Sequence, residues 1–290
     1  MNLSLPRSFP IAKAALAAAV ITCAFALACS LIGCASGGTD SSSADAGNTS
    51  ASTDGKTLRV AMELAYPPFE TKDDAGNPEG LAVDFIRDFG AAYGYDVQIE
   101  NTAWDGLIPS LQSDKADLVI SSMTITDERK QSVDFSDAYA MAQLAILANA
   151  DSGVASIDDL NQPGKKVAVK TGSTGDVYAT KNLTNAEIVR LADESACVTE
   201  VVQGKADGFL YDQLTIYRNH QANPDTTEAV FIPFQDAEEW GIAVKKGNTE
   251  LLDQLNAFIA QSKTDGEFDR LTEKYLAEEK AAFDELGFRW

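Results

Sequence analysis

A loop that joins hydroxyl side chains to an arginine is the part of this sequence best suited to hold an anion. The loop reads SSMTITDER and supplies Ser121, Ser122, Thr124 and Arg129. A guanidinium can hold both oxygens of a carboxylate at once, and hydroxyl and loop N–H groups can complete the hydrogen bonds. In the alternative interpretation, Thr126 is only a helix N-cap and Arg129 lies in an exposed first turn.

Two residues after an early apolar run could face the same binding site from another direction. Glu63 and Tyr66 follow the run Leu58–Met62 (LRVAM), and the two residues after Tyr66 are prolines. Because prolines rigidify a turn, these two side chains should keep fixed directions. Trp104 comes after a later apolar stretch and would supply a second aromatic wall. A packed turn, with Tyr66 capping the core, is the alternative.

Two further loops carry groups for a charged ligand. The loop Thr171–Asp176 (TGSTGD) contains Ser173 and Thr174, and its backbone N–H groups could face an anion at a helix N-terminus. Asp212 follows an apolar run, where a carboxylate could receive an ammonium group. As a helix N-cap the same aspartate would be unremarkable.

Taken together, these loops offer a cation for a carboxylate, an anion for an ammonium group and aromatic walls. That combination describes a free amino acid. The sequence offers no nucleophile–base pair, no metal-ligand spacing and no phosphate-binding loop, and His220, the single histidine, is expected on the surface. We therefore expect no catalytic residue, no metal and no cofactor.

The elements that must position these loops alternate along the chain. Apolar runs with strand character and stretches with helical spacing follow one another, which predicts an α/β fold. The expected strands are 58–62, 97–99, 118–120, 144–148, 166–169, 187–191, 208–210 and 241–244, and the expected helices are 81–93, 105–112, from 174, 194–203, 213–220, 249–262 and 267–276.

This order predicts two α/β lobes, the first completed by the end of the chain. The chain would cross between the lobes near 144–148 and near 240–244, and two crossings form a hinge around a cleft. In open α/β sheets a ligand lies beyond the carboxyl ends of the strands, where the loops described above are found. The tail 277–290 could add a helix to the first lobe.

The N-terminal part has the features of an exported and anchored protein. Arg7 and Lys13 precede the apolar run Ala14–Ala28, which is short for a membrane-spanning helix and indicates a secretion signal. The run ends in LIGC, which resembles the lipobox of bacterial lipoproteins, so Cys34 is the expected lipid attachment site. The Ser-, Gly- and Ala-rich residues that follow predict a flexible tether. Cys197 is expected to be a small core residue.

Charge and length limit the remaining choices. The formal net charge of −21 makes nucleic acid a poor partner. After the tether, about 230 residues remain, which exceeds the commonest size of a single domain. The predicted division is a signal peptide at 1–33, a tether at 34–56, lobe 1 at 57–144 plus 241–290, and lobe 2 at 145–240. We expect a monomer.

The loops and their flanking strands resemble family 3 of the extracellular solute-binding proteins, the polar amino-acid receptors of ABC importers. The resemblance covers nearly all of residues 56–276 and implies a two-lobed, type II periplasmic-binding-protein fold with a two-segment hinge. The segments that carry it are LRVAMELAYPPFE, NTAWDGLIPSLQSDKADLVISSMTITDERKQSVDFSDAY, KKVAVKTGSTGDVY and EWGIAVKKGN.

The resemblance also implies a role for each site residue. Arg129 would bind the α-carboxylate with help from Thr124 and from Ser173 and Thr174; Ser122, Thr124 and Asp212 would hold the α-ammonium; Tyr66 and Trp104 would enclose the side chain. Gly175 departs from members with a larger polar residue at this position, which puts any contact from that side chain in doubt.

Glu63 lies where some receptors for basic amino acids use a carboxylate to meet the side-chain charge. A glutamate there disfavours an acidic ligand. The expected ligands are therefore arginine, lysine or histidine first, and glutamine or another neutral polar amino acid second. If Glu63 instead pairs with a neighbouring cation of lobe 1, this preference weakens.

The resulting hypothesis is a receptor anchored by lipid at the extracytoplasmic face of the cell membrane, which delivers a polar amino acid to an ABC permease. Contacts from both lobes, such as those of Arg129 and Asp212, would favour closure around the ligand. Two alternatives stay open: a periplasmic enzyme similar to cyclohexadienyl dehydratases, with Glu63 as the candidate acid or base, and a ligand sensor for a membrane signalling protein.

Overall fold

The computed structural model describes residues 56–286. The expected signal peptide, the tether and Cys34 lie outside the described residues. The described residues all belong to one compact unit. None of their helices is long and apolar enough to cross a lipid bilayer.

Within residues 56–286, the first of two five-stranded sheets has the order β4-β1-β5-β14-β6. Its strands are β1 (Lys56–Met62), β4 (Tyr95–Asn101), β5 (Leu118–Val119), β6 (Val133–Phe135) and β14 (Ala243–Lys245). Strand β1 runs parallel to β4 and β5, whereas β14 runs antiparallel to β5 and β6. The sheet is therefore mixed, and a segment from near the end of the chain completes it.

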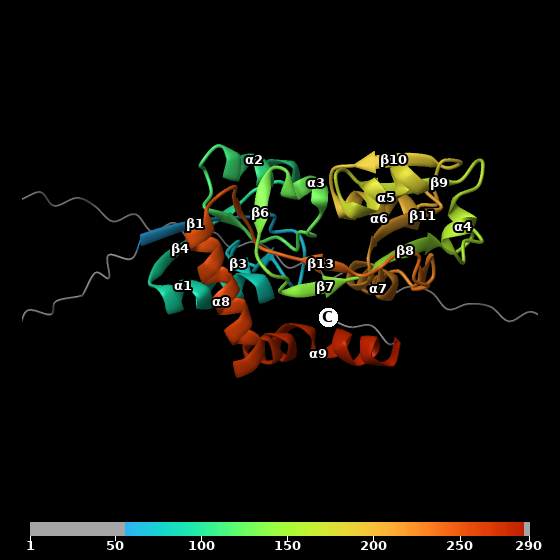
Figure 1. The fold of residues 1–290 in the computed structure, drawn as a ribbon. Helices are drawn as coiled ribbons and strands as arrows, with labels where there is room; N and C mark the ends of the chain where they lie inside the picture. Colours follow the sequence, from blue (N-terminus) through green and yellow to red (C-terminus); the bar gives the residue numbers. More distant parts are fainter. Residues whose placement is uncertain (1–55, 287–290) are drawn as a thin grey trace, which may run out of the picture. The chain divides into compact units, whose positions relative to one another are not determined.

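Side chains of β1 alternate between two cores, as the geometry of a strand requires. Val60 and Met62 pack among the residues of helices α1 (Leu81–Tyr93) and α8 (Thr249–Asp265). Ala61 faces the opposite way, toward α2 (Leu107–Gln112). Helices thus cover both faces of this sheet (Figure 1). The sheet and these helices together form lobe 1.

Helix α1 has the bounds that the sequence predicts. One of its faces is fully buried against the sheet, and Gly94 ends it in the left-handed conformation, with φ of 74°. Glycine adopts that conformation without a steric penalty from a Cβ atom. The predicted helix 105–112 is also present, divided into a 3₁₀ turn at Trp104–Gly106 and α2.

The second sheet has the order β10-β9-β11-β8-β12. Its strands are β8 (Leu144–Asn149), β9 (Lys166–Lys170), β10 (Glu187–Leu191), β11 (Gly208–Asp212) and β12 (Thr227–Val230), and its helices are α4 (Ile157–Leu160), α5 (Thr174–Asn182), α6 (Glu194–Val202) and α7 (Gln213–Ala222). These elements are called lobe 2.

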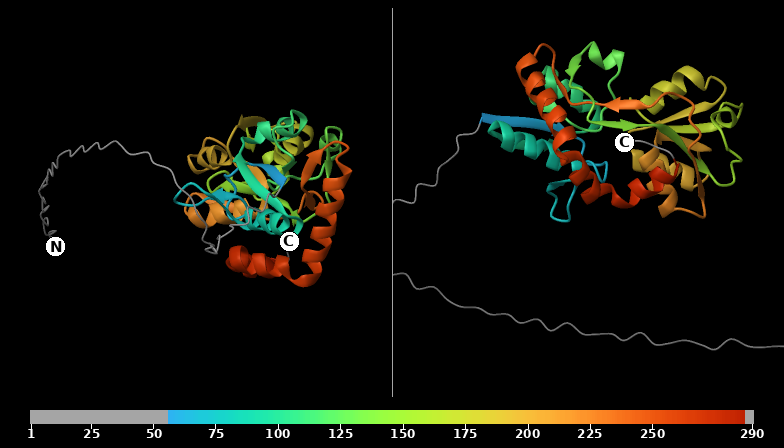
Figure 2. Two further views of the ribbon diagram at one scale, coloured as in Figure 1. Left: turned by 90° about the vertical axis from the view of Figure 1, so that its left-hand side faces the viewer. Right: turned by 60° about the horizontal axis from the view of Figure 1, so that its bottom comes forward.

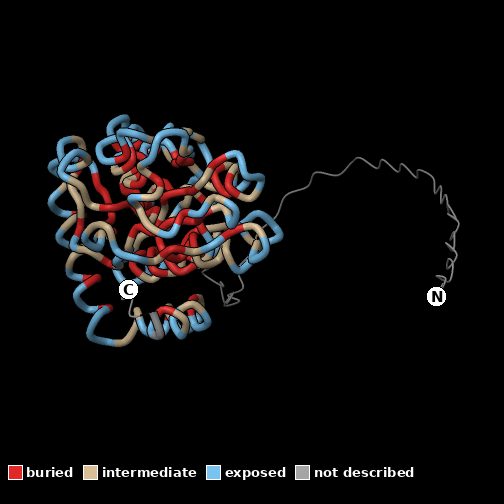
Figure 3. Tube along the Cα trace, turned by 90° about the vertical axis from the view of Figure 1, so that its right-hand side faces the viewer, coloured by how far each residue is buried: buried red, intermediate tan, exposed pale blue. Residues whose placement is uncertain are grey.

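Apolar side chains again fill both faces of this sheet. Val167 and Val169 pack toward α5, whereas Ala168 packs toward α6, where Cys197 is fully buried. The expectation that Cys197 is a core residue is confirmed. His220 differs from expectation, because it is half-buried and its ring contacts the hydroxyl of Thr227 at 3.2 Å. Figure 3 shows the buried segments running through the interior of the body.

The chain passes between the sheets through a separate pair of antiparallel strands, β7 (Ala140–Ala142) and β13 (Glu238–Trp240). Both crossings come a few residues earlier than predicted, because 144–148 already belongs to β8 of the second sheet and 243–245 to β14 of the first. Figure 1 shows β7 and β13 between the two sheets.

Helix α9 (Glu267–Leu286) contacts both lobes. Its first part binds lobe 1, where Lys274 and Tyr275 each donate to Asp84 of α1 at 2.7 Å. At Leu276 the backbone departs from helical dihedral angles, and α9 is kinked there. Residues 277–286 of the tail thus form a helix, as the sequence suggests, and they continue α9 beyond the part that binds lobe 1 (Figure 2).

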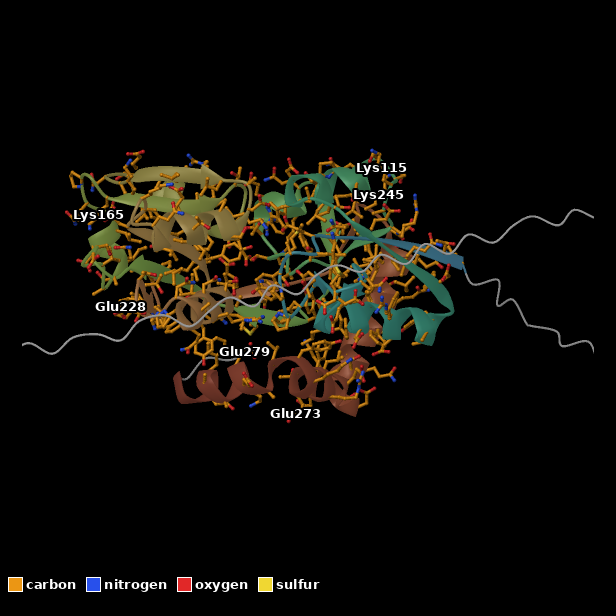
Figure 4. The ribbon with its side chains drawn as sticks, turned by 180° about the vertical axis from the view of Figure 1, so that it is seen from behind. Lys115, Lys165, Glu228, Lys245, Glu273 and Glu279 are labelled. Atoms are coloured by element: carbon orange, nitrogen blue, oxygen red, sulfur yellow. The ribbon has the colours of Figure 1, made fainter. Side chains whose placement is uncertain are left out.

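The second part of α9 reaches lobe 2, which the sequence did not predict. The rings of Phe283 and Tyr217 of α7 lie 5.4 Å apart, and Glu279 forms an ion pair with Arg218 at 3.6 Å. Figure 4 shows Glu279 on the side of α9 that faces the body and Glu273 on the outer side.

Candidate functional site

The loops at the ends of the strands enclose a cavity of about 40 Å³ between the lobes. Every ligand-binding residue predicted from the sequence lines it. The lining consists of Glu63, Tyr66, Glu70, Trp104, Ser121, Ser122, Thr124, Arg129, Leu144, Ser173, Thr174, Tyr211, Asp212, Glu238 and Trp240. The cavity is the size of one or two water molecules, so the lining side chains contact one another across it.

Asp212 forms the polar end of one wall. Its carboxylate caps α7 by accepting the backbone N–H groups of Leu214 and Thr215, each at 3.0 Å. The same oxygen accepts the hydroxyl of Tyr66 from lobe 1 at 2.7 Å. Burial raises the pKa of Asp212. The aspartate is thus an N-cap, as one interpretation holds, and it also faces the cavity.

Glu63 is paired with a lysine that no motif in the sequence indicates. Lys170, the last residue of β9, donates to its carboxylate, and only 4% of the lysine side chain is exposed. The other carboxylate oxygen accepts the N–H of Trp104 at 3.3 Å. We expected any such cation to come from lobe 1; it comes from lobe 2. Neutralisation by Lys170 weakens the argument that Glu63 selects a basic ligand.

Arg129 spans the cleft. Its guanidinium donates to the carbonyl oxygen of Thr124 at 2.7 Å and to that of Gly172 in lobe 2 at 3.2 Å, and it lies 5.2 Å from the centre of the Trp104 ring. Thr126 does cap the short helix α3 (Asp127–Lys130) by accepting the N–H of Arg129. Burial lowers the pKa of Arg129. Thr126 is therefore an N-cap, but Arg129 faces the cleft and does not lie in an exposed first turn.

Glu238, at the start of β13, joins the two lobes through its carboxylate. One oxygen accepts the hydroxyls of Thr124 from lobe 1 and Thr174 from lobe 2, each at 2.8 Å. The other oxygen accepts the amide of Gln235 at 2.7 Å. The negative charge of Glu238 also counteracts the lowering of the pKa of Arg129.

Glu70 is the most deeply buried acid of the cavity, with 1% of its surface exposed. One of its oxygens accepts the hydroxyl of Ser122 at 3.1 Å. The other has no hydrogen-bond partner among the described residues. Burial holds the pKa of Glu70 well above its ordinary value. An unpaired buried carboxyl oxygen is costly, and a ligand that donates a proton or brings a positive charge would remove that cost.

Aromatic rings close the cavity more fully than Tyr66 and Trp104 could alone. The Tyr66 ring centre lies 5.7 Å from that of Trp240 and 6.4 Å from that of Tyr211, both edge-on. Tyr211 directly precedes Asp212, and Trp240 follows Glu238 by two residues on β13. In a strand, residues two apart share a face, so this spacing was the available signal for the pair on β13.

A close backbone contact explains why residue 175 is a glycine. A Cβ atom there would lie 2.4 Å from the carbonyl oxygen of Leu210, so a larger residue requires the backbone of α5 to move away from β11. Within the described part of the chain, no group of three or more His, Cys, Asp or Glu residues is placed to hold a metal ion.

Comparison with known proteins identifies the family. The family model for bacterial extracellular solute-binding proteins, family 3, matches residues 58–278. The chain belongs to this family. The match includes both lobes and every residue lining the cavity, and it ends within α9.

Relatives with curated names cover most of the chain. A probable histidine-binding protein of Neisseria gonorrhoeae is 36% identical over 259 residues, 88% of this chain and 95% of its own. The L-cystine-binding protein TcyJ of Escherichia coli K12 is 32% identical over 222 residues, 76% of this chain and 82% of its own. An L-arginine-binding protein of Pseudomonas aeruginosa is 33% identical over 243 residues, 77% and 88% of the two chains.

Solved structures share the fold. A putative binding component of an ABC transporter from Wolinella succinogenes, complexed with lysine, has a TM-score of 0.72 and 35% identity, and covers 77% of this chain and 97% of its own. The ancestral amino-acid-binding protein AncCDT-1, a precursor of cyclohexadienyl dehydratase, has a TM-score of 0.69 and 39% identity over 76% and 94%. The fold of this solute-binding protein is therefore the type II periplasmic-binding-protein fold, with two α/β lobes and mixed sheets.

Proposed function

We propose that this solute-binding protein is an extracytoplasmic receptor that captures a polar amino acid between its lobes and delivers it to an ABC import permease. The family and the names of the relatives support an amino acid as ligand. The observation that carries the proposal is the cavity itself, because groups complementary to a carboxylate, an ammonium group and a side chain converge on it from both lobes.

In this proposal Arg129, with Thr124 and Thr174, holds the α-carboxylate, and Asp212 holds the α-ammonium. Arg129 belongs to lobe 1 and Asp212 to lobe 2, so an amino acid that contacts both stabilises the closed arrangement over the open one. The present cavity of about 40 Å³ is too small for an amino acid. Binding must therefore exchange contacts among the lining residues for contacts with the ligand.

We propose basic amino acids as the preferred ligands, and glutamine or another neutral polar amino acid as the second choice. The support comes from Glu70 more than from Glu63, whose charge is balanced by Lys170. Glu70 presents an unpaired oxygen in a cavity where, apart from the Glu63–Lys170 pair, two other carboxylates and one guanidinium are present. A protonated side chain of the ligand would offset this excess of negative charge. The lysine complex of the Wolinella protein is consistent with this preference.

Calorimetry with L-arginine and L-citrulline tests the preference for a basic ligand and the role of Glu70 in it. Citrulline has nearly the shape of arginine without its positive charge. We expect wild-type protein to bind arginine more tightly by about tenfold or more, and Glu70→Gln to remove most of that difference, because it removes the acid and keeps the shape. Equal binding of the two ligands by wild-type protein would refute the basic preference. A thermal-shift screen against the other amino acids would then identify the ligand.

We propose that this protein binds its ligand without catalysing a reaction, although the structurally similar AncCDT-1 is a precursor of an enzyme. Incubation with prephenate or arogenate distinguishes the two, since product formation would revive the dehydratase hypothesis. Delivery to a permease is distinguished from signalling by the genes next to this one: a permease gene and an ATPase gene support transport, whereas a membrane sensor gene supports signalling.

We also propose that Cys34 is lipidated and holds the protein at the extracytoplasmic face of the membrane. The sequence LIGC supports this assignment. Metabolic labelling with a palmitate analogue should mark the wild-type protein, and Cys34→Ala should lose the label and leave the membrane fraction. Labelling of Cys34→Ala at the wild-type level would exclude Cys34 as the attachment site.

A further inference from the structure

Glu238 contacts the same hydroxyl groups as the proposed ligand carboxylate. One carboxylate oxygen accepts hydrogen bonds from the hydroxyls of Thr124 and Thr174, each at 2.8 Å, and the negative charge raises the pKa of Arg129 against the effect of burial. These three residues are the proposed carboxylate-binding groups. A carboxylate that belongs to the protein therefore holds the hydroxyls that a ligand carboxylate requires.

Glu238 and a ligand carboxylate would compete for the same two hydroxyl groups, because each hydroxyl can donate only one hydrogen bond. A threonine hydroxyl carries a single proton, and both of these protons are committed to one oxygen of Glu238. A second carboxylate in the same small cavity would also repel the first. An amino acid can take the hydroxyls of Thr124 and Thr174 only if Glu238 leaves them.

Because Glu238 lies on a strand that joins the lobes, its displacement would also change how the lobes are held together. Glu238 pairs with Ala142 in the β7–β13 ladder that joins the lobes. Its side chain bridges Thr124 of lobe 1 and Thr174 of lobe 2, so it contributes to holding the cleft closed. Glu239, the next residue on β13, points to the opposite face of the strand and is exposed.

We propose that Glu238 is an internal substitute for the ligand carboxylate, a specificity-determining gate that bridges the two lobes until an amino acid displaces it and bridges them in its place. The inference rests on the proposed amino-acid receptor function. It requires that a displacing ligand carry a free α-carboxylate, since an amine alone does not compete for the hydroxyls that Glu238 holds.

Calorimetry on wild-type protein, Glu238→Gln and Glu239→Gln tests the gate with two probes, L-arginine and agmatine. Agmatine is arginine without the α-carboxylate. In Glu238→Gln a neutral amide replaces the charge, and charge-assisted hydrogen bonds are about twice as strong as neutral ones. We expect Glu238→Gln to bind arginine about tenfold more tightly, a difference of about 1.4 kcal/mol, while its affinity for agmatine changes less than twofold. Glu239→Gln, which loses the same charge from the same strand, should match wild-type protein with both probes.

Weaker binding of arginine by Glu238→Gln would overturn the proposal, because Glu238 would then contact the ligand directly. Equal tightening for arginine and agmatine would also overturn it, since the effect would not depend on the α-carboxylate. Small-angle X-ray scattering of the three proteins without added amino acid gives a readout that does not need ligand binding. Glu238→Gln should have the larger radius of gyration, and unchanged dimensions would refute the gate. If wild-type protein binds no arginine, the basic preference fails and the scattering comparison alone decides the role of Glu238.

Discussion

Lys170→Met is the substitution from which the structure predicts the most informative result. The ammonium group of Lys170 is the partner of Glu63 across the cleft, and the two side chains are only 4% and 14% exposed. Removing one partner of a buried pair typically costs about 3–5 kcal/mol, because the other charge stays buried without compensation. Lys170 also lies 5.3 Å from the centre of the Trp104 ring, and this contact is lost too.

Because the pair joins the two lobes, the cost falls on the closed arrangement of the cleft as well as on unfolding. We expect Lys170→Met to lower the free energy of unfolding in urea by about 3 kcal/mol and to increase the radius of gyration. The double variant Glu63→Gln, Lys170→Met should recover most of this loss, because no buried charge remains at the pair. Lys166→Met is the matched control: its ion pair with Glu187 on the same sheet is exposed, and such pairs contribute about 0–1 kcal/mol.

The same variant should also change ligand preference. Without Lys170, the carboxylate of Glu63 is free to meet a cation, so the affinity for L-arginine relative to L-citrulline should rise about tenfold or more, measured by calorimetry. The reasoning is wrong if the double variant is as unstable as Lys170→Met, or if the ratio of the two affinities stays at the wild-type value. Either result would mean that Glu63 and Lys170 do not compensate one another.

Three further predictions concern other parts of the molecule. Arg129→Ala should weaken binding of L-arginine by about 2–5 kcal/mol in calorimetry and that of agmatine much less, and equal losses would contradict its role at the carboxylate. Burial raises the pKa of Glu194 from 4.5 to about 8, so between these pH values the folded protein holds a proton that the unfolded chain has lost. The free energy of unfolding should therefore fall as pH rises across this interval, and Glu194→Gln should flatten the profile; an identical slope in the variant would exclude Glu194. Phe283→Ala should cost about 3–5 kcal/mol of stability in urea, whereas Glu273→Gln on the outer face of the same helix should cost less than about 0.5 kcal/mol.

Most of the fold can be predicted from the sequence, because the features that determine it are local. Helix α1 is predicted with its bounds from apolar spacing and Gly94. The strand pairs that join the lobes are harder, since β7 and β13 have three residues each and pair across about 100 residues of chain. A three-residue strand has too little alternation to be recognised, so the crossings are predicted a few residues late.

The site residues divide in the same way. Those in a motif, such as Arg129, or directly after an apolar run, such as Asp212, are found from the sequence and line the cavity. Glu70 and Glu238 are missed, although Glu70 ends one quoted segment and Glu238 directly precedes another, because a single acidic residue has no pattern that distinguishes it from a solvated one. The partnership of Glu63 with Lys170 joins residues 107 positions apart and exists only where the lobes meet. No local property of the sequence indicates it.

Helix α9 has a consequence for how this solute-binding protein can evolve. Its last turns lie beyond residue 278, where the match to the family ends, and they attach to α7 of lobe 2 while the first turns attach to α1 of lobe 1. Any change in the separation of the lobes must be accommodated by this added contact. Substitutions along a terminal helix can therefore tune how tightly an amino acid is retained, and selection can adjust affinity without altering a single residue of the recognition surface.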